Sequence, residues 1–201
     1  MTSDSMNRCE QEHLKRWLET TRNYLFADLD SADLDSLPRA AVGAEDGWTA
    51  PHTGSNGGRK RFLARVRGRL LRSVGHGGTS DPLSELERAF QQQITFIAKH
   101  PDVPWRLLSW LARDDHPGLQ RRVLMLINHY ANRLARIIAR AEQEGLIRAD
   151  IKPHAAAVSL VDVIQKLAFE THATSQRGES FLRKASEAFV LYRSALVAPS
   201  K

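Results

Sequence analysis

The strongest constraint on this chain is the helical spacing of its apolar residues, which recur every three or four positions from residue 81 to residue 197. Prolines and glycines interrupt this pattern and divide it into segments. No segment alternates apolar and polar residues with a period of two, as a half-buried strand would. The sequence therefore predicts an all-α fold, with C-terminal helices over residues 81–100, 103–112, 118–144, 153–174 and 178–197.

The N-terminal third of the chain is less clearly specified. Nine of the 12 glycines lie between Gly43 and Gly78, so backbone freedom is concentrated there. An apolar stripe predicts a helix over residues 7–27, whereas residues 43–58 show no periodicity and are expected to form a loop. A chain of 201 residues has room for one domain with a small attachment. We expect three parts: a head over residues 1–58, a connecting helix and loop over 59–78, and a helical domain over 79–201.

Residues 59–74 combine a helical apolar face with concentrated positive charge. Seven arginines and lysines occur there with no acidic residue among them, and the whole chain carries a formal charge of +6. Such a segment either contacts phosphates or an anionic surface, or forms a helix with a solvated cationic face. The apolar positions are Phe62, Leu63, Val66, Leu70 and Val74, and the basic ones are Arg59, Lys60, Arg61, Arg65, Arg67, Arg69 and Arg72.

Features typical of enzymes, metal sites and membrane proteins are missing from the sequence. The eight histidines are scattered without ligand spacing, and Cys9 is the only cysteine. Residues 54–58 are rich in glycine but lack the Lys-Ser/Thr of a phosphate-binding loop. No apolar run approaches the roughly 18 residues of a membrane span, and the N-terminus lacks a signal-peptide pattern. We expect a cytoplasmic protein without catalytic activity, metal ion or cofactor, and without a membrane partner.

Four stretches of the C-terminal two-thirds resemble the regulatory domain of the TetR family of bacterial transcriptional regulators. Their order, and the helix lengths between them, agree with that family over about 60% of the chain. The stretches are Asp81–Phe90, Phe96–Pro104, Ala141–Ile151, and Asp150–Ala157 with Ile164–Leu167.

This resemblance implies a fold of about nine helices, in which the first three hold a helix-turn-helix that enters the DNA major groove. The fourth helix joins this head to the regulatory domain, and the last two pair with those of a second subunit. A ligand in the regulatory core then shifts the spacing of the two heads. The chain would thus be a homodimeric regulator, with operator DNA and a small apolar or amphipathic molecule as partners.

The amino-acid sequence departs from the family's pattern in the region where the DNA-binding head is expected. Tyr24–Ala27 is similar to the end of the first helix, but residues 44–58 hold Pro51 and several glycines in place of a recognition helix. Three explanations are open: a diverged head that no longer binds DNA, degenerate binding through the basic helix, or a shifted reading frame between about residues 28 and 75. An intact mass of 22.6 kDa for the natural protein would exclude the last.

Three groups of side chains are the candidate functional residues. The phosphate contacts are expected at Arg59, Lys60 and Arg61. Aromatic residues with a few polar neighbours suit an apolar ligand pocket, although each also suits an ordinary core. These pocket candidates are Phe90, Trp105, Trp110, Met125, His129, Tyr130, Gln165 and Phe169. The candidates for the dimer interface are Leu160, Ile164, Leu167, Phe181, Phe189 and Tyr192.

The sequence supports two functions. The first is a DNA-binding regulator, most simply a repressor released by its ligand. The second is a ligand-binding and dimerisation module that has lost sequence-specific DNA binding. Residues 28–58 distinguish them, since the first function needs three helices with a tight turn in the head.

Overall fold

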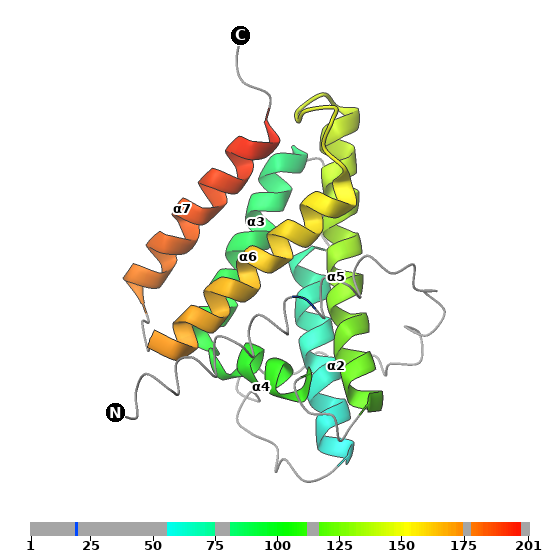
Figure 1. Ribbon diagram of the computed structural model, residues 1–201, viewed down its shortest axis with the longest axis vertical. Helices are drawn as coiled ribbons and strands as arrows, with labels where there is room; N and C mark the ends of the chain where they lie inside the picture. Colours follow the sequence, from blue (N-terminus) through cyan, green and yellow to red (C-terminus); the bar gives the residue numbers. More distant parts are fainter. Residues whose placement is uncertain (1–18, 20–55, 75–80, 112–116, 175–177, 198–201) are drawn as a thin grey trace.

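A computed structural model describes residue 19 and residues 56–74, 81–111, 117–174 and 178–197 (Figure 1). Every regular element in these ranges is an α-helix, so the predicted all-α class is confirmed. None of the described helices is long and apolar enough to cross a membrane. The six helices are α2 (Asn56–Ser73), α3 (Pro82–Lys99), α4 (Asp102–Leu111), α5 (Pro117–Gln143), α6 (Pro153–Thr174) and α7 (Glu179–Leu196).

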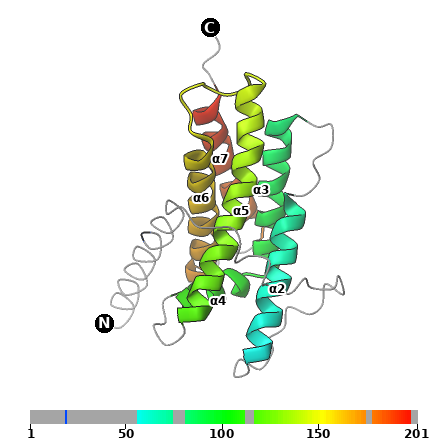
Figure 2. The ribbon, with the colours of Figure 1, turned by 90° about the vertical axis from the view of Figure 1, so that its right-hand side faces the viewer.

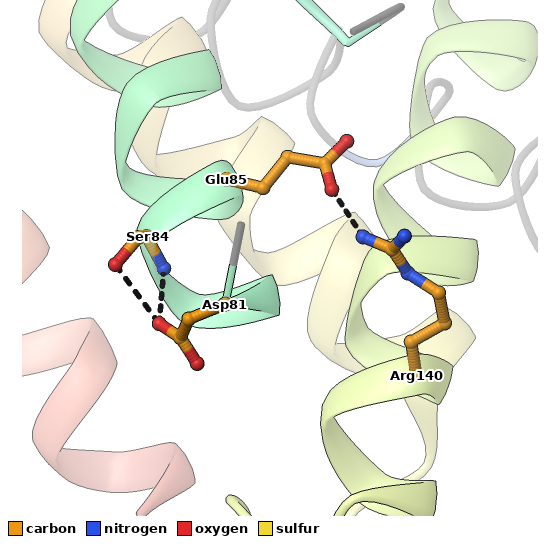
Figure 3. A network of polar contacts seen from close by, with 4 residues as sticks. All are labelled: Asp81, Ser84, Glu85 and Arg140. Carbon is orange, nitrogen blue, oxygen red and sulfur yellow. Dashed lines mark hydrogen bonds and ion pairs between the residues drawn. The ribbon is translucent and has the colours of Figure 1, made fainter. Parts of the chain in front are cut away.

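The predicted start of α3 and end of α5 are confirmed in their hydrogen bonding. Asp81 is the N-cap of α3, and its carboxylate accepts from the Ser84 backbone N–H at 2.8 Å and from the Ser84 hydroxyl at 2.9 Å (Figure 3). Helix α5 ends in a left-handed turn at Gly145, which has a φ of 71°. The N–H of Leu146 donates to the carbonyl of Ala141 at 2.8 Å, as in a Schellman motif.

Helix α5 is the longest element and lies against four other helices, α2, α3, α4 and α6 (Figures 1 and 2). Helix α7 packs on α3 and α6, at one edge of the molecule in Figure 1. The helices share one apolar core, in which Phe90, Ile94 and Leu134 are completely buried. The backbone N–H of Arg148, after α5, donates to the Leu196 carbonyl at 3.0 Å and joins that loop to the end of α7.

Helix α2 belongs to this core, because its four predicted apolar positions are buried, as is Val74 directly after it. The ring of Phe62 meets Trp110 of α4 edge to face with 5.3 Å between centroids. The guanidinium of Arg69 lies 5.5 Å from the centroid of Phe96 on α3. The helix begins at Asn56, three residues before the predicted start, so Gly57 and Gly58 lie in its first turn.

A buried carboxylate joins α3 to α5 (Figure 3). The side chain of Glu85 is only 3% exposed and forms an ion pair with Arg140, whose side chain is 42% exposed. A buried carboxylate is costly unless it is paired, so Arg140 offsets the cost of burying the charge of Glu85.

The predicted helix over residues 7–27 lies outside the described residues apart from Glu19, which is helical and exposed. The predicted loop over residues 43–58 also lies outside them up to residue 55.

We expect Asp81→Ala to lower the free energy of unfolding by about 1 kcal/mol at neutral pH, since the first turn of α3 loses its cap. The bond from the Ser84 N–H holds the pKa of the Asp81 carboxyl below its usual range. The ionised Asp81 carboxylate therefore contributes its full stabilisation above the pKa of about 3.9 that aspartate has in the unfolded chain. This stabilisation is lost as the pH falls through the lower pKa of Asp81 in the folded protein.

Urea unfolding of the wild type and the variant between pH 7 and pH 2.5 measures this difference. The gap in unfolding free energy should narrow below about pH 4. Asp81→Asn is the matched control, because asparagine caps helices without a titrating group and should stay near the wild type at neutral pH. A gap that is constant over this pH range would contradict the assignment.

Candidate functional site

A cavity of about 90 Å³ lies among five helices of the bundle. Thirteen of its 16 lining side chains are apolar, and no lining residue carries a formal charge at neutral pH. Helix α4 contributes the most residues, and α2 closes one part of the wall with Val66 and Leu70. The remaining lining residues are Gln93, Phe96, Ile97, Val103, Pro104, Leu107, Leu108, Leu111, Ile127, Tyr130, Val161, Ile164, Gln165 and Ala168.

Three helices each place one polar side chain in the cavity wall: Gln93 from α3, Tyr130 from α5 and Gln165 from α6. The amide oxygens of both glutamines and the hydroxyl of Tyr130 are buried, and none has a hydrogen-bond partner in the part of the chain that the structure describes. Buried polar atoms are nearly always paired, and each unpaired one costs stability. These three side chains therefore combine a place in the cavity wall with a buried oxygen that lacks a partner.

The phenol of Tyr130 stays uncharged in this setting. Burial raises the pKa of Tyr130 well above its ordinary value, and the neighbouring Ser73 hydroxyl only partly opposes the rise. The Ser73 hydroxyl donates to the Leu70 carbonyl at 2.7 Å and does not form a well-aligned bond with the phenol. Tyr130 can accordingly both donate and accept a hydrogen bond.

Two of the eight predicted pocket residues, Tyr130 and Gln165, line this cavity. Phe90 instead stacks on Phe189 of α7 with centroids 4.8 Å apart, in the core between α3 and α7. The ring of Trp105 lies 6.1 Å from that of Phe169, between α4 and α6. Trp110, Met125 and His129 also lie outside the lining residues: Trp110 packs on Phe62 of α2, while Met125 and His129 are half-buried on α5.

Gln93 is not among the predicted pocket residues, although its position in the sequence held a usable signal. Gln93 follows Leu86 and Phe90 at helical spacing and precedes Ile97, so it occupies a core position of α3. A polar residue at such a position must find a partner or remain unsatisfied. The contributions of α2 and α4 carried no comparable signal, because their apolar residues resemble any other core residues.

The three predicted phosphate contacts lie near the start of α2. Lys60 and Arg61 are exposed and Arg59 is half-buried, and the first turn of the helix has no acidic residue. The N-terminus of a helix carries a partial positive charge, which repels nearby cations. An anion at this end would be attracted both by the side chains and by the helix terminus.

The six predicted dimer residues pack largely within their own chain. Leu160, Ile164, Leu167, Phe181 and Phe189 are buried in the shared core, and the half-buried Tyr192 donates to the Ala156 carbonyl at 2.8 Å. Among the described residues, the exposed large apolar side chains lie on α7: Leu182, Val190 and Leu191 are 40%, 62% and 71% exposed.

Among the described residues, no group of three or more histidine, cysteine, aspartate or glutamate side chains is arranged to hold a metal ion. No protein-family model matches the chain, and no curated protein matches it either.

Gln93→Leu should raise the free energy of unfolding by roughly 1 kcal/mol, because the change removes an unpaired buried amide oxygen and keeps an apolar stem. Chemical denaturation of the ligand-free protein measures the effect. Gln92→Leu, at the half-buried neighbouring position, is the matched control and should change stability by less than about 0.5 kcal/mol. Destabilisation by Gln93→Leu alone would mean that the amide has a partner.

Proposed function

We propose that the protein is a homodimeric DNA-binding transcriptional regulator similar to the TetR family, acting as a repressor that a small apolar or amphipathic ligand releases. The observation that supports it best is the double role of α2. Its exposed positions include the basic residues Lys60, Arg61, Arg65 and Arg72, and its inward side supplies Val66 and Leu70 to the cavity wall. The proposed ligand site and the proposed DNA contact therefore share one helix.

This arrangement gives ligand and DNA a physical route to influence each other. A ligand can shift an equilibrium only if it binds one conformation better than another. A molecule in the cavity touches Val66 and Leu70, so its affinity depends on where α2 lies. The positions of Arg59, Lys60 and Arg61 depend on the same helix, and by linkage DNA and ligand would then alter each other's affinity.

The salt dependence of DNA binding tests the role of the basic helix. We expect Arg59→Ala, Lys60→Ala and Arg61→Ala each to flatten the slope of log affinity against log salt by about one unit, because each removes one phosphate contact. Fluorescence anisotropy with labelled DNA from the gene's own upstream region, compared with scrambled DNA, measures the slopes. Lys166→Ala, which removes an exposed cation of α6, is the control and should leave the slope unchanged.

The same titration separates the two candidate functions. Binding that prefers the upstream sequence and survives moderate salt supports the regulator. Binding that is equal on both DNAs and disappears at moderate salt reflects charge attraction alone. The protein would then be a ligand-binding and dimerisation module, which the cavity supports equally well.

The exposed apolar side chains of α7 support the homodimer. Leu191→Glu should convert the dimer to a monomer, because it places a charge in the proposed subunit contact. The fold should stay intact, because the side chain of Leu191 is 71% exposed. Sedimentation velocity gives the oligomeric state. The matched control is Asn132→Glu at an exposed position of α5, which should leave the dimer unchanged. A dimer that survives Leu191→Glu would place the interface elsewhere.

A further inference from the structure

Helix α5 carries a second concentration of positive charge, in addition to that of α2. It holds five arginines and a single acidic residue, Glu142, which lies in its last turn. Helix α2 holds seven cations and no acidic residue. In each of α3, α4, α6 and α7 the numbers of acidic and basic residues differ by at most one. Among the described helices, the positive charge is therefore concentrated on α2 and α5.

The arginines of α5 share one side of the helix. Arg133 and Arg140 follow Arg122 by 11 and 18 residues, which correspond to about three and five helical turns. None of the five arginines is buried, and Arg121 and Arg136 are exposed. They therefore lie away from the side of α5 that packs into the core. Arg140 is already engaged in the ion pair with Glu85, so the other four remain as candidates for an anionic partner.

The start of α5 lies close to the start of α2. The two helices pack on each other and begin at the same end of the molecule, the lower end in Figures 1 and 2. Helix α4 connects their first turns: Phe62 of α2 meets Trp110 with centroids 5.3 Å apart, and the side-chain amide of Gln120 in α5 donates to the Leu111 carbonyl at 3.0 Å. Phe62 directly follows the three proposed phosphate contacts of α2. Gln120 directly precedes the first two arginines of α5.

We propose that Arg121 and Arg122 bind phosphates of the same DNA duplex that Arg59, Lys60 and Arg61 contact. This inference rests on the proposed DNA-binding function and extends its contact surface from α2 to the start of α5. A duplex carries one phosphate charge about every 1.7 Å along its axis, so cations from two neighbouring helices can each reach a phosphate of their own.

The chemistry of this surface favours DNA over an anionic membrane. Eleven of the 12 cations on α2 and α5 are arginines, whose planar guanidinium binds a phosphate group through two parallel hydrogen bonds. A helix that lies on a membrane inserts an apolar face into it. The apolar residues Phe62, Leu63 and Val66 of α2 are buried in the protein core instead. The exposed large apolar side chains of the described residues lie on α7.

The salt dependence of DNA binding tests this contact on the full chain. We expect Arg121→Ala and Arg122→Ala each to flatten the slope of log affinity against log salt by about one unit. Arg122→Lys should keep the slope of the wild type, because it retains the positive charge. Fluorescence anisotropy with labelled upstream and scrambled DNA measures the slopes, and thermal melting verifies that each variant is folded. Arg121 is exposed, so its replacement should leave the fold intact.

Arg136→Ala is the matched control. It removes the same charge from an exposed position on the same side of α5, about 21 Å further along the helix than Arg122. We expect this variant to keep the slope of the wild type. If it flattened the slope as much as Arg122→Ala does, the slope would depend on net charge and not on the start of α5, and the inference would be wrong.

The remaining outcomes separate this inference from the proposed function. Unchanged slopes in Arg121→Ala and Arg122→Ala, with a flattened slope in Arg61→Ala, would overturn the inference and leave the regulator standing. Equal affinity for both DNAs, with flattened slopes in the two α5 variants, would refute the regulator and support the phosphate contact. A wild type that binds neither DNA would refute both.

Co-sedimentation with phosphatidylserine vesicles tests the alternative partner. If Arg121→Ala and Arg122→Ala abolished vesicle binding and left the DNA slopes unchanged, the surface would belong to a membrane contact and the inference would be overturned.

Discussion

The burial of α5 is the constraint on which the rest of the described structure depends. Its buried residues come in runs of two and three, such as Leu126, Ile127 and Asn128. Consecutive helical residues point about 100° apart, so these runs make the buried face too wide for one neighbouring helix to cover. Four helices surround it instead. The Glu85–Arg140 ion pair adds a polar contact between α3 and α5 and compensates the buried carboxylate.

The cavity lies where several of these helices meet, and its wall works against stability. Its polar side chains Gln93, Tyr130 and Gln165 each have a buried oxygen without a partner among the described residues, which lowers the free energy of unfolding relative to an apolar core. Functional sites are where such local conflicts are expected to persist. The same wall includes Val66 and Leu70 of α2, the helix that also carries the exposed cations Lys60, Arg61, Arg65 and Arg72. A molecule in the cavity would therefore lie against the helix that holds these charges.

Much of the fold was predictable because its signals are local. Asp81 followed by Pro82 marks a helix start, Gly145 marks a helix end, and the apolar spacing of α2 matches its buried face. The contacts made by the buried residues were not predictable. Phe181 and Phe189 belong to apolar faces that could equally meet a second subunit, and only the packing of α7 on α3 and α6 assigns them to their own core.

The sequence by itself determined the helical class, the start of α3, the end of α5 and the concentration of cations on α2, since each depends on residues close together in the chain. The tertiary structure decided which side chains surround the cavity. Tyr130 and Gln165 were predicted for a pocket, but Gln93 joined them and Phe90 did not. An aromatic residue at helical spacing has the same local pattern in a solid core and beside a cavity. The difference lies in how helices distant in sequence fill the space around it, which local spacing does not encode.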